Sequence, residues 1–390
     1  MASPNTLTNL IPTLYAALDI VSREQIGFIP AVTRDSTCDR VALNQSVNVP
    51  IVGKITPVSI SPGSYAPDTG GATPGNVAVT ISNQYAAPIA WNGDEQIATT
   101  ETGIYASVVT QRFAQAMRAV ANLVENDLGA LHINASRAAG TYNVQPFATA
   151  NDFSDMSAAL QILEDNGAPT TDLHSVLSTT AIANIRGKQS VLFKVNEAGT
   201  ADMLRRGIIG DILGVALHAS AGVRRAVTVG TSNNAGTTDT TGYPVGTTSI
   251  TMASAGSGTI IPGDIVTFAG DSNQYVATTT VAALGSGGTL GLAAPGLMKA
   301  VAASNVVVTV IAATDRNMLF SRNAIVLATR MPYMPEGGDM ADDVIDLVDP
   351  ISGLTFQVAM YRQYRQVHFE VGLAWGVKCI KPEHAVIVMG

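Results

Sequence analysis

The segment at residues 99–138 constrains the fold more than any other part of the chain, because it has the pattern of one long amphipathic helix. Apolar side chains follow one another at intervals of three and four positions, as one buried face of an α-helix requires. This face consists of Val109, Phe113, Met117, Val120, Val124, Leu128 and Leu131. At about 1.5 Å per residue, about three dozen residues would extend for about 50 Å. We therefore expect a spine helix against which the other elements pack.

The charge content of the chain is low for its size. Of its 390 residues, 13% are charged and 46% are hydrophobic, whereas globular domains usually contain about 25% charged residues. Because charged surface keeps monomers apart, this composition favours a protein that buries surface against other subunits. The net charge of −8 argues against a conventional nucleic-acid-binding protein, since such binding depends on clustered Lys and Arg.

Two further segments predict peripheral elements, each of which needs a packing partner that the sequence does not identify. Residues 6–26 predict an amphipathic helix that stops at Gly27. Its apolar face consists of Leu10, Leu14, Leu18 and Val21. Residues 47–97 predict a long β-hairpin, in which two arms rich in β-branched residues flank the tip sequence SPGSYAPDTGGATPG. Because a two-stranded arm is only marginally stable alone, it must lie on its own domain or on a neighbouring subunit. The terminal helix has the same two alternatives.

The remaining segments indicate an α+β fold with an insertion. Two shorter helices are expected within residues 151–187, the first ending at Gly167 and the second at Gly187. From residue 224 to residue 312 the chain is rich in Thr, Val, Ala, Ser and Gly, and its short strand candidates predict an inserted all-β barrel or sandwich. The C-terminal part predicts the strand NAIVLATRMP, a turn or hairpin in ADDVIDLVDPISGLTFQVAMY, the long strand HFEVGLAWGVKCI, a turn at Lys381–Pro382–Glu383 and the last strand HAVIVM.

No group of residues in the sequence predicts catalysis, a cofactor or a metal site, so the chain is expected not to be an enzyme. The five histidines lack HxH and HExxH spacing, and Cys38 and Cys379 lack CxxC spacing. The glycine-rich residues 285–291 lack the lysine of a phosphate-binding loop, and we expect a turn there. The acidic residues between Asp339 and Asp349 could bind a cation, form a solvated edge or pair with basic residues across an interface.

No membrane association is expected either. The sequence has no run of about 18 apolar residues that would predict a membrane span, and the N-terminal segment lacks the basic residues of a signal peptide. With two scattered cysteines, synthesis in a reducing cytoplasm is expected.

Three stretches of sequence and the order of the elements carry a resemblance to a known family. PGDIVTFAG in the insertion and RNMLFSRNAIVLATRMP after it resemble the coat protein of the P-twenty-two podovirus. The end of the chain, LAWGVKCIKPEHAVIVMG, resembles the closing strands and the basic-Pro-Glu turn of related capsid proteins. A terminal helix, a long hairpin, a spine helix, a mixed domain and a terminal strand pair follow in the order of the Hong Kong 97 phage capsid fold. The chain thus resembles tailed-bacteriophage major capsid proteins with an inserted β domain, although the helix connections at 140–200 are not clear matches.

The resemblance implies an N-terminal arm at residues 1–30, an extended loop at 47–97, peripheral and axial domains over 98–223 and 313–390, and an inserted β-barrel domain at 224–312. It further implies a subunit that self-assembles through hexamers and pentamers into an icosahedral shell. That shell would enclose double-stranded DNA without sequence-specific binding. A separate scaffolding protein and a portal are implied partners, and a decoration protein is a further candidate. The protein would be made in the bacterial host cytoplasm and reside in the virion capsid. Candidate subunit-interface residues are Leu10, Leu14, Leu18, Lys54, Ile55, Asp68 and Trp91.

Three alternatives stay open at this point. A tail tube or decoration protein is also β-rich and low in charge, but such a protein rarely needs so long a helix. A hydrolase with a β accessory domain would need a compact cluster of catalytic residues, for which the sequence offers no candidate. An encapsulin-type compartment protein shares the shell fold, and the insertion favours a phage protein over it.

Overall fold

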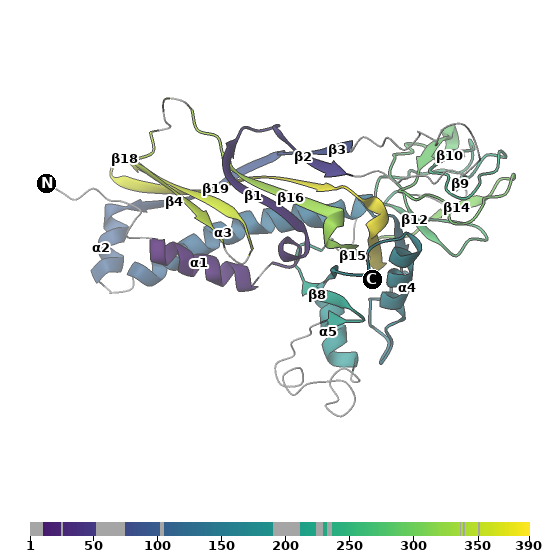
Figure 1. The fold of residues 1–390 in the computed structure, drawn as a ribbon, viewed down its shortest axis with the longest axis horizontal. Coiled ribbons are helices and arrows are strands. Elements are labelled where there is room, and N and C mark those ends of the chain that lie inside the picture. Colours follow the sequence, from purple (N-terminus) through teal and green to yellow (C-terminus); the bar gives the residue numbers. More distant parts are fainter. Residues whose placement is uncertain are drawn as a thin grey trace, which may run out of the picture.

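The protein forms an elongated body in which helix α3 (Tyr105–Ala130) runs roughly along the long axis (Figure 1). Helices α4 (Ser154–Asp165) and α5 (Thr179–Lys188) lie on one long side, and the strands of the insertion lie at one end. None of the helices in the described part of the chain is long and apolar enough to cross a bilayer. The computed structural model describes residues 11–24, 26–51, 75–101, 105–189, 211–223, 229–231, 236–335, 337, 340–349 and 352–390.

Helix α3 buries the apolar face that the sequence predicts. Phe113, Met117 and Leu128 are fully buried in one large core, which α3 shares with β4 (Asn83–Asn92) and β19 (Gln366–Cys379). Burial of one such large apolar side chain contributes about 1.5–3 kcal/mol. The spine helix is therefore held to the sheet along most of its length.

The predicted helix over 99–138 is confirmed over α3 but is wrong at its C-terminal end. The helical path gives way to a short 3₁₀ turn, η3 (Leu131–Asn134), and then to strand β5 (Arg137–Ala139). The Ser136 N–H donates to the Ala385 carbonyl at 2.9 Å, so pairing with the C-terminal strand overrides the local helical pattern. With 26 residues, α3 extends for about 39 Å. Upstream, α2 (Gly93–Glu101) is a separate helix drawn at a different angle (Figure 1).

Helix α1 (Ile11–Glu24) confirms the predicted N-terminal helix over the part that the structure describes. It lies beside α3 (Figure 1), with Leu14, Ala17 and Leu18 buried in the same large core. Of the two alternatives for this helix, the structure shows docking on its own chain.

A six-stranded mixed sheet covers α3. Its order is β1-β16-β19-β18-β17, and β4 pairs antiparallel with β19. The predicted strand, hairpin and long strand of the C-terminal part are confirmed here as β16, the β17–β18 pair and β19. The bounds of the strands not yet given are Thr33–Val41 for β1, Ile325–Pro332 for β16, Asp343–Val348 for β17 and Thr355–Gln363 for β18.

A second sheet of ten strands has the order β7-β8-β6-β15-β20-β5-β12-β11-β14-β9. The predicted basic-Pro-Glu turn, η7 (Pro382–His384), joins β19 of the first sheet to β20 of the second. The bounds are Asp211–Ile212 for β7, Val215–Ala219 for β8, Leu173–Leu177 for β6, Arg316–Ser321 for β15, Ala385–Met389 for β20, Gln274–Val276 for β12, Ile265–Phe268 for β11, Val307–Val310 for β14 and Gly236–Thr237 for β9.

The two predicted helices of the 151–187 segment are confirmed as α4 and α5, and they pack on this second sheet. Gly167 follows α4 with a positive φ of 74°, as a helix stop requires. Gly187 lies inside α5 rather than after it, so the expected stop there is wrong. The helix continues for one more residue and ends at Lys188, before buried Gln189.

The described part of the insertion is all-β, as expected, and has its own apolar core, which includes Ile250, Phe268 and Leu290. Strands β10 (Ser249–Met252) and β13 (Gly288–Gly291) form a separate pair. However, β12 pairs with β5, so the insertion also extends the ten-stranded sheet. Closure of the insertion into a barrel stays a prediction.

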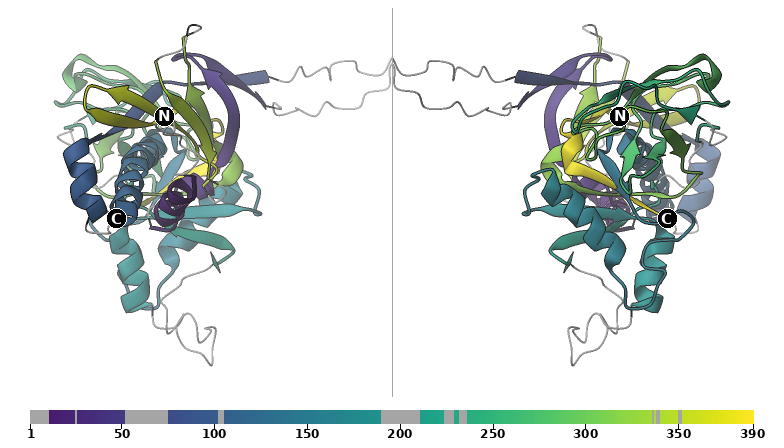
Figure 2. Two further views of the ribbon diagram at one scale, coloured as in Figure 1. Left: turned by 90° about the vertical axis from the view of Figure 1, so that its left-hand side faces the viewer. Right: turned by 90° about the vertical axis from the view of Figure 1, so that its right-hand side faces the viewer.

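The predicted 47–97 hairpin is confirmed at its base and corrected in its second arm. Strands β2 (Ser46–Ile51) and β3 (Gly75–Thr80) pair antiparallel, but β4 joins the six-stranded sheet instead of continuing that arm. The division falls at buried Ile81, whose N–H donates to the Gln45 carbonyl at 2.8 Å. Figure 2 shows the β2–β3 pair leading away from the body. The predicted tip lies outside the described residues.

Candidate functional site

The described interface candidates lie in the protein's own core. Leu14 and Leu18 are buried against α3, and Trp91 on β4 is 2% exposed, with the Arg112 guanidinium 4.2 Å from the centre of its ring. Leu10, Lys54, Ile55 and Asp68 lie outside the described residues. The roles of all seven in subunit contacts stay predictions.

The β2–β3 hairpin, which we call the arm, is fixed at its base only. Val79 and Ile81 are buried against the six-stranded sheet beside Val326, Ala328 and Ala374. The sheet approaches the arm so closely at Gly376 that an added Cβ would lie 2.1 Å from the Thr80 carbonyl oxygen, which explains why a glycine interrupts this strand.

The other end of the arm has little packing within the described chain. Pro50, Gly75 and Asn76 are exposed, and Ile51 is only half-buried. Because a two-stranded hairpin needs a packing partner to be stable, the arm is a candidate for contact with another molecule.

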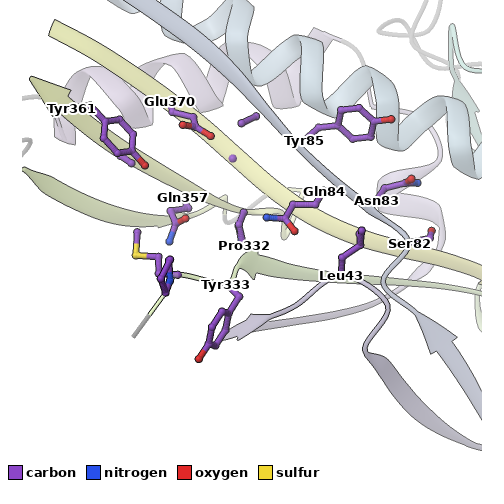
Figure 3. A pocket seen from close by; sticks show the side chains of 15 residues that line it. Leu43, Ser82, Asn83, Gln84, Tyr85, Pro332, Tyr333, Gln357, Tyr361 and Glu370 are labelled. Atoms are coloured by element: carbon purple, nitrogen blue, oxygen red, sulfur yellow. The ribbon is translucent and has the colours of Figure 1, made fainter. Parts of the chain in front are cut away.

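A groove of about 680 Å³ lies beside the base of the arm, on the six-stranded sheet (Figure 3). It is formed by the start of β4, the end of β16 and the middle of β18 and β19. Leu43, Tyr85 and Tyr333 line it, and about half of each side chain is exposed. Large exposed apolar side chains around a concave surface are typical of an interaction site.

The wall of the groove is held firmly by α3. The Tyr85 ring lies 5.5 Å from the Trp375 ring, measured between centroids. The Trp375 Nε1–H donates to Asp127 Oδ2 at 2.8 Å, and the Asn83 amide donates to the same oxygen at 2.7 Å. One carboxylate on the spine helix thereby orients side chains of both β4 and β19.

Two polar groups give the groove its chemistry. Gln357 is 6% exposed, and its Nε2 finds no hydrogen-bond partner within the described part of the chain. An unpaired buried donor of this kind costs about 1–3 kcal/mol. Glu370 is the only charged side chain among the described lining residues. The groove therefore offers an unpaired hydrogen-bond donor at Gln357, a negative charge at Glu370 and an aromatic rim.

A buried carboxylate that the sequence analysis missed ties three segments together. Glu125 of α3 accepts hydrogen bonds from the backbone N–H groups of Gly27, Phe28 and Ile29 at 2.9–3.1 Å and from the Ser220 hydroxyl at 2.6 Å. Burial raises the pKa of Glu125, against the opposing effect of these hydrogen bonds. The only signal in the sequence is an acidic residue between Val124 and Leu128, on the otherwise apolar side of the helix.

Two of the five histidines come together although no motif relates them. Neighbouring parallel strands β6 and β8 place His174 Nδ1 3.0 Å from His218 Nε2. Asp172 and Arg322 both contact the other ring nitrogen of His174. Burial, His174 and Arg322 lower the pKa of His218 to about 4, against the opposing effect of Asp211. No group of metal-binding side chains is present among the described residues. The cluster joins β6, β8 and the 3₁₀ turn η6 (Arg322–Ala324), which follows β15.

Both ends of the acidic stretch between Asp342 and Asp349 bond to groups of their own chain. Asp342 forms an ion pair with Arg362 at 2.8 Å, and Asp349 accepts a hydrogen bond from the Ser352 N–H at 3.1 Å. Asp343 and Asp346 lie on β17, at the edge of the six-stranded sheet. Charge on an edge strand opposes pairing with another chain, so this edge fits the solvated alternative.

Comparisons with known proteins find similarity only at the level of the fold. No family model matches the sequence, and no curated protein matches it. The chain is similar to a solved structure from Mycobacterium phage Che8, with a TM-score of 0.44, 12% identity and coverage of 88% of this chain and 84% of that chain. It is similar to the capsid structure of Cyanophage P-SCSP1u, with a TM-score of 0.47, 10% identity and coverage of 93% and 88%. It is also similar to a virus-like particle from Pyrococcus furiosus, with a TM-score of 0.44, 8% identity and coverage of 97% and 99%. None of these TM-scores reaches 0.5.

Proposed function

We propose that this chain is the major capsid protein of a tailed bacteriophage. It folds as an α+β subunit of the Hong Kong 97 type and self-assembles into an icosahedral shell that encloses double-stranded DNA. The observation that carries the proposal is the β2–β3 arm. Its base is packed on the sheet, and its far end leads away from a body whose cores are complete without it.

The composition of the chain supports assembly. Only 13% of its residues are charged, and charged surface is what keeps monomers apart. A specific interface of the usual size buries about 800 Å² per partner. Many such contacts, repeated by symmetry, hold a closed shell together.

The remaining parts of the proposal concern partners and location. Hexamers and pentamers of this chain build the shell, with a separate scaffolding protein, a portal and a decoration protein as further partners. The chain is made in the host cytoplasm and ends in the virion capsid, without enzymatic activity. Its net charge of −8 suits a shell that surrounds DNA without gripping it. The inserted domain, with its separate core, is a barrel of the P-twenty-two podovirus type.

Two other structural roles are the alternatives. A tail tube or decoration protein would form rings or bind to a finished shell rather than close into a shell by itself. An encapsulin-type compartment would assemble from the same fold but would package protein cargo instead of DNA. Electron microscopy of the assembled particles and their nucleic-acid content separates all three.

The test uses the full chain and one variant without the tip of the arm. In the variant, an Asn-Gly turn replaces residues 52–74 between Ile51 and Gly75, which face each other in the β2–β3 register. We expect the full chain, co-expressed with a candidate scaffolding protein, to form closed shells. The variant should stay folded by circular dichroism but sediment as small oligomers. A full chain that remains monomeric under every assembly condition would refute the proposed function.

A further inference from the structure

Strand β4 is an edge of the six-stranded sheet that the described part of the chain leaves open. Among the described residues, β4 pairs only with β19. The other two edges of this sheet carry charge, since β17 contains Asp343 and Asp346 and β1 contains Arg34 and Arg40. The sequence of β4, NQYAAPIAWN, contains no charged residue. Because charge on an edge strand opposes pairing with another chain, β4 is the edge of this sheet that can accept a further strand.

Two observations show which backbone groups of β4 face away from β19. The Arg112 guanidinium donates to the Ala90 carbonyl at 3.2 Å, which places this carbonyl on the open edge. Backbone groups alternate between the two edges along a strand, so Pro88, Ala86 and Gln84 share that edge. Proline fits there because its missing N–H costs no bond to β19. The outward N–H groups of Gln84 and Ala86 have no backbone partner among the described residues.

A second groove, which we call the edge groove, lies between this open edge and one side of α3. Its volume is about 670 Å³, which is in the range of binding clefts. Strand β4 lies beside α3 (Figure 1) and contributes residues 87–90 to the lining. On α3, the buried Ala114 and Ala116 line the groove. Small side chains at these positions leave room for an extended chain next to β4.

Arginine gives the edge groove a positive charge. Arg112 and Arg118 are the only charged side chains among the described residues that line it, and Gln111 and Gln115 add amide groups. The Arg112 guanidinium is held in place 4.2 Å from the centre of the Trp91 ring. A guanidinium in a fixed position binds carboxylates through charge-assisted hydrogen bonds. The groove therefore matches an extended segment that carries acidic side chains.

We propose that the edge groove receives an extended acidic segment of a different protein, which adds a strand beside residues 84–90 and places a carboxylate at Arg112. Hydrogen bonds between the two backbones supply affinity, as in other cases of strand addition to an open sheet edge. The two arginines select for acidic side chains. The inference goes beyond the proposed function, because it concerns a partner other than this chain and a property of the single subunit.

The first experiment measures binding of a short fluorescent peptide to the dilute full chain by anisotropy. The peptide consists of Thr and Val with two aspartates on one face. We expect saturable binding that weakens about tenfold when one of the two alternating sets of backbone nitrogens is methylated, because methylation removes the donors that face β4. Lysines in place of the aspartates should weaken binding about fivefold or more.

Three results would overturn the inference. The first is that the acidic peptide does not bind saturably. The second is that both N-methylated peptides, or the lysine peptide, bind as tightly as the acidic one. The third is that the wild type dimerises in sedimentation and thereby excludes the peptide, since a second copy would then occupy β4.

The second experiment changes the protein. A86P removes an outward N–H without a loss to the β19 ladder, and R112Q removes the charge at the groove; each should weaken binding of the acidic peptide about fivefold. R186Q is the matched control, since Arg186 is exposed on α5 and does not line the groove, and its affinity should equal that of the wild type. Circular dichroism verifies that each variant is folded. Equal affinities of the wild type and R112Q would overturn the inference and leave the proposed function intact, whereas absence of shells from the wild type would refute only the proposed function.

Discussion

Replacing Glu125 by alanine removes a carboxylate to which four donors from two distant segments are bonded. The three backbone N–H groups of Gly27, Phe28 and Ile29 and the Ser220 hydroxyl would all lose their acceptor inside the core. At the lower end of about 1–3 kcal/mol for each unpaired buried donor, the free energy of unfolding should fall by about 4 kcal/mol. This is a large share of the stability of an ordinary domain.

The matched variant is E125Q, which keeps the shape of the side chain. Its amide oxygen can retain the three backbone N–H groups, and its amide nitrogen can donate to the Ser220 hydroxyl. We therefore expect a loss of only about 1 kcal/mol. The free energy of unfolding is measured by urea denaturation of the dilute subunit, followed by the fluorescence of Trp91 and Trp375.

The same pair of proteins gives a pH test. Burial raises the pKa of Glu125 above its ordinary value of 4.5, so the folded state holds the proton more tightly than the unfolded chain does. Its contribution to stability is then complete below pH 4.5 and is lost as the pH rises through the folded pKa. The wild type should lose stability relative to E125Q over that window. A cost of less than about 1 kcal/mol for E125A, or an opposite pH trend, would refute this account of Glu125.

Three further predictions concern single positions. G376A should destabilise the protein by about 1–3 kcal/mol, because the new Cβ would lie 2.1 Å from the Thr80 carbonyl oxygen; an unchanged melting temperature would contradict this. G187A should stabilise the protein by about 0.5–1 kcal/mol, since Gly187 lies inside α5 with no atom within 4 Å of an added Cβ; any loss of stability in urea would count against it. The pKa of His218 is lowered from 6.5 to about 4. The free energy of unfolding should therefore fall by about 1–2 kcal/mol as the pH falls from 6.5 to 4, because His218 is partly exposed and the full effect is screened by solvent. H218Q should lack this pH dependence, and identical pH profiles for the two proteins would contradict the prediction.

Local periodicity was sufficient to predict the elements that bury one continuous face. The apolar stripe of α3, the C-terminal strands and the basic-Pro-Glu turn all lie where the sequence indicates. Strand β6 was missed because its five residues are all buried although His174 and Ser175 are polar, so the sequence shows neither alternation nor a continuous apolar run. Its neighbours β8 and β15 are distant in sequence, and only tertiary pairing defines it.

The candidate sites show the limit of the same reasoning. The stripe of Leu14 and Leu18 predicts that one face of the N-terminal helix is buried, but it does not say what buries it. For Trp91, likewise, the sequence does not say whether its own chain or another subunit covers the ring. The groove beside the base of the arm was missed because its lining comes from five separate parts of the chain. The property that marks it, the unpaired amide of Gln357, exists only after these parts meet.

Helix α1 and the arm therefore differ in the effect that their removal would have on assembly. Because α1 is buried against α3, removing it would expose the core and destabilise the subunit itself. The arm contributes only its base to the core, so loss of its tip should leave a folded subunit. We therefore expect a variant that folds but does not assemble to result from truncation of the arm and not from removal of α1. The arm is for this reason the element whose truncation separates self-association from folding.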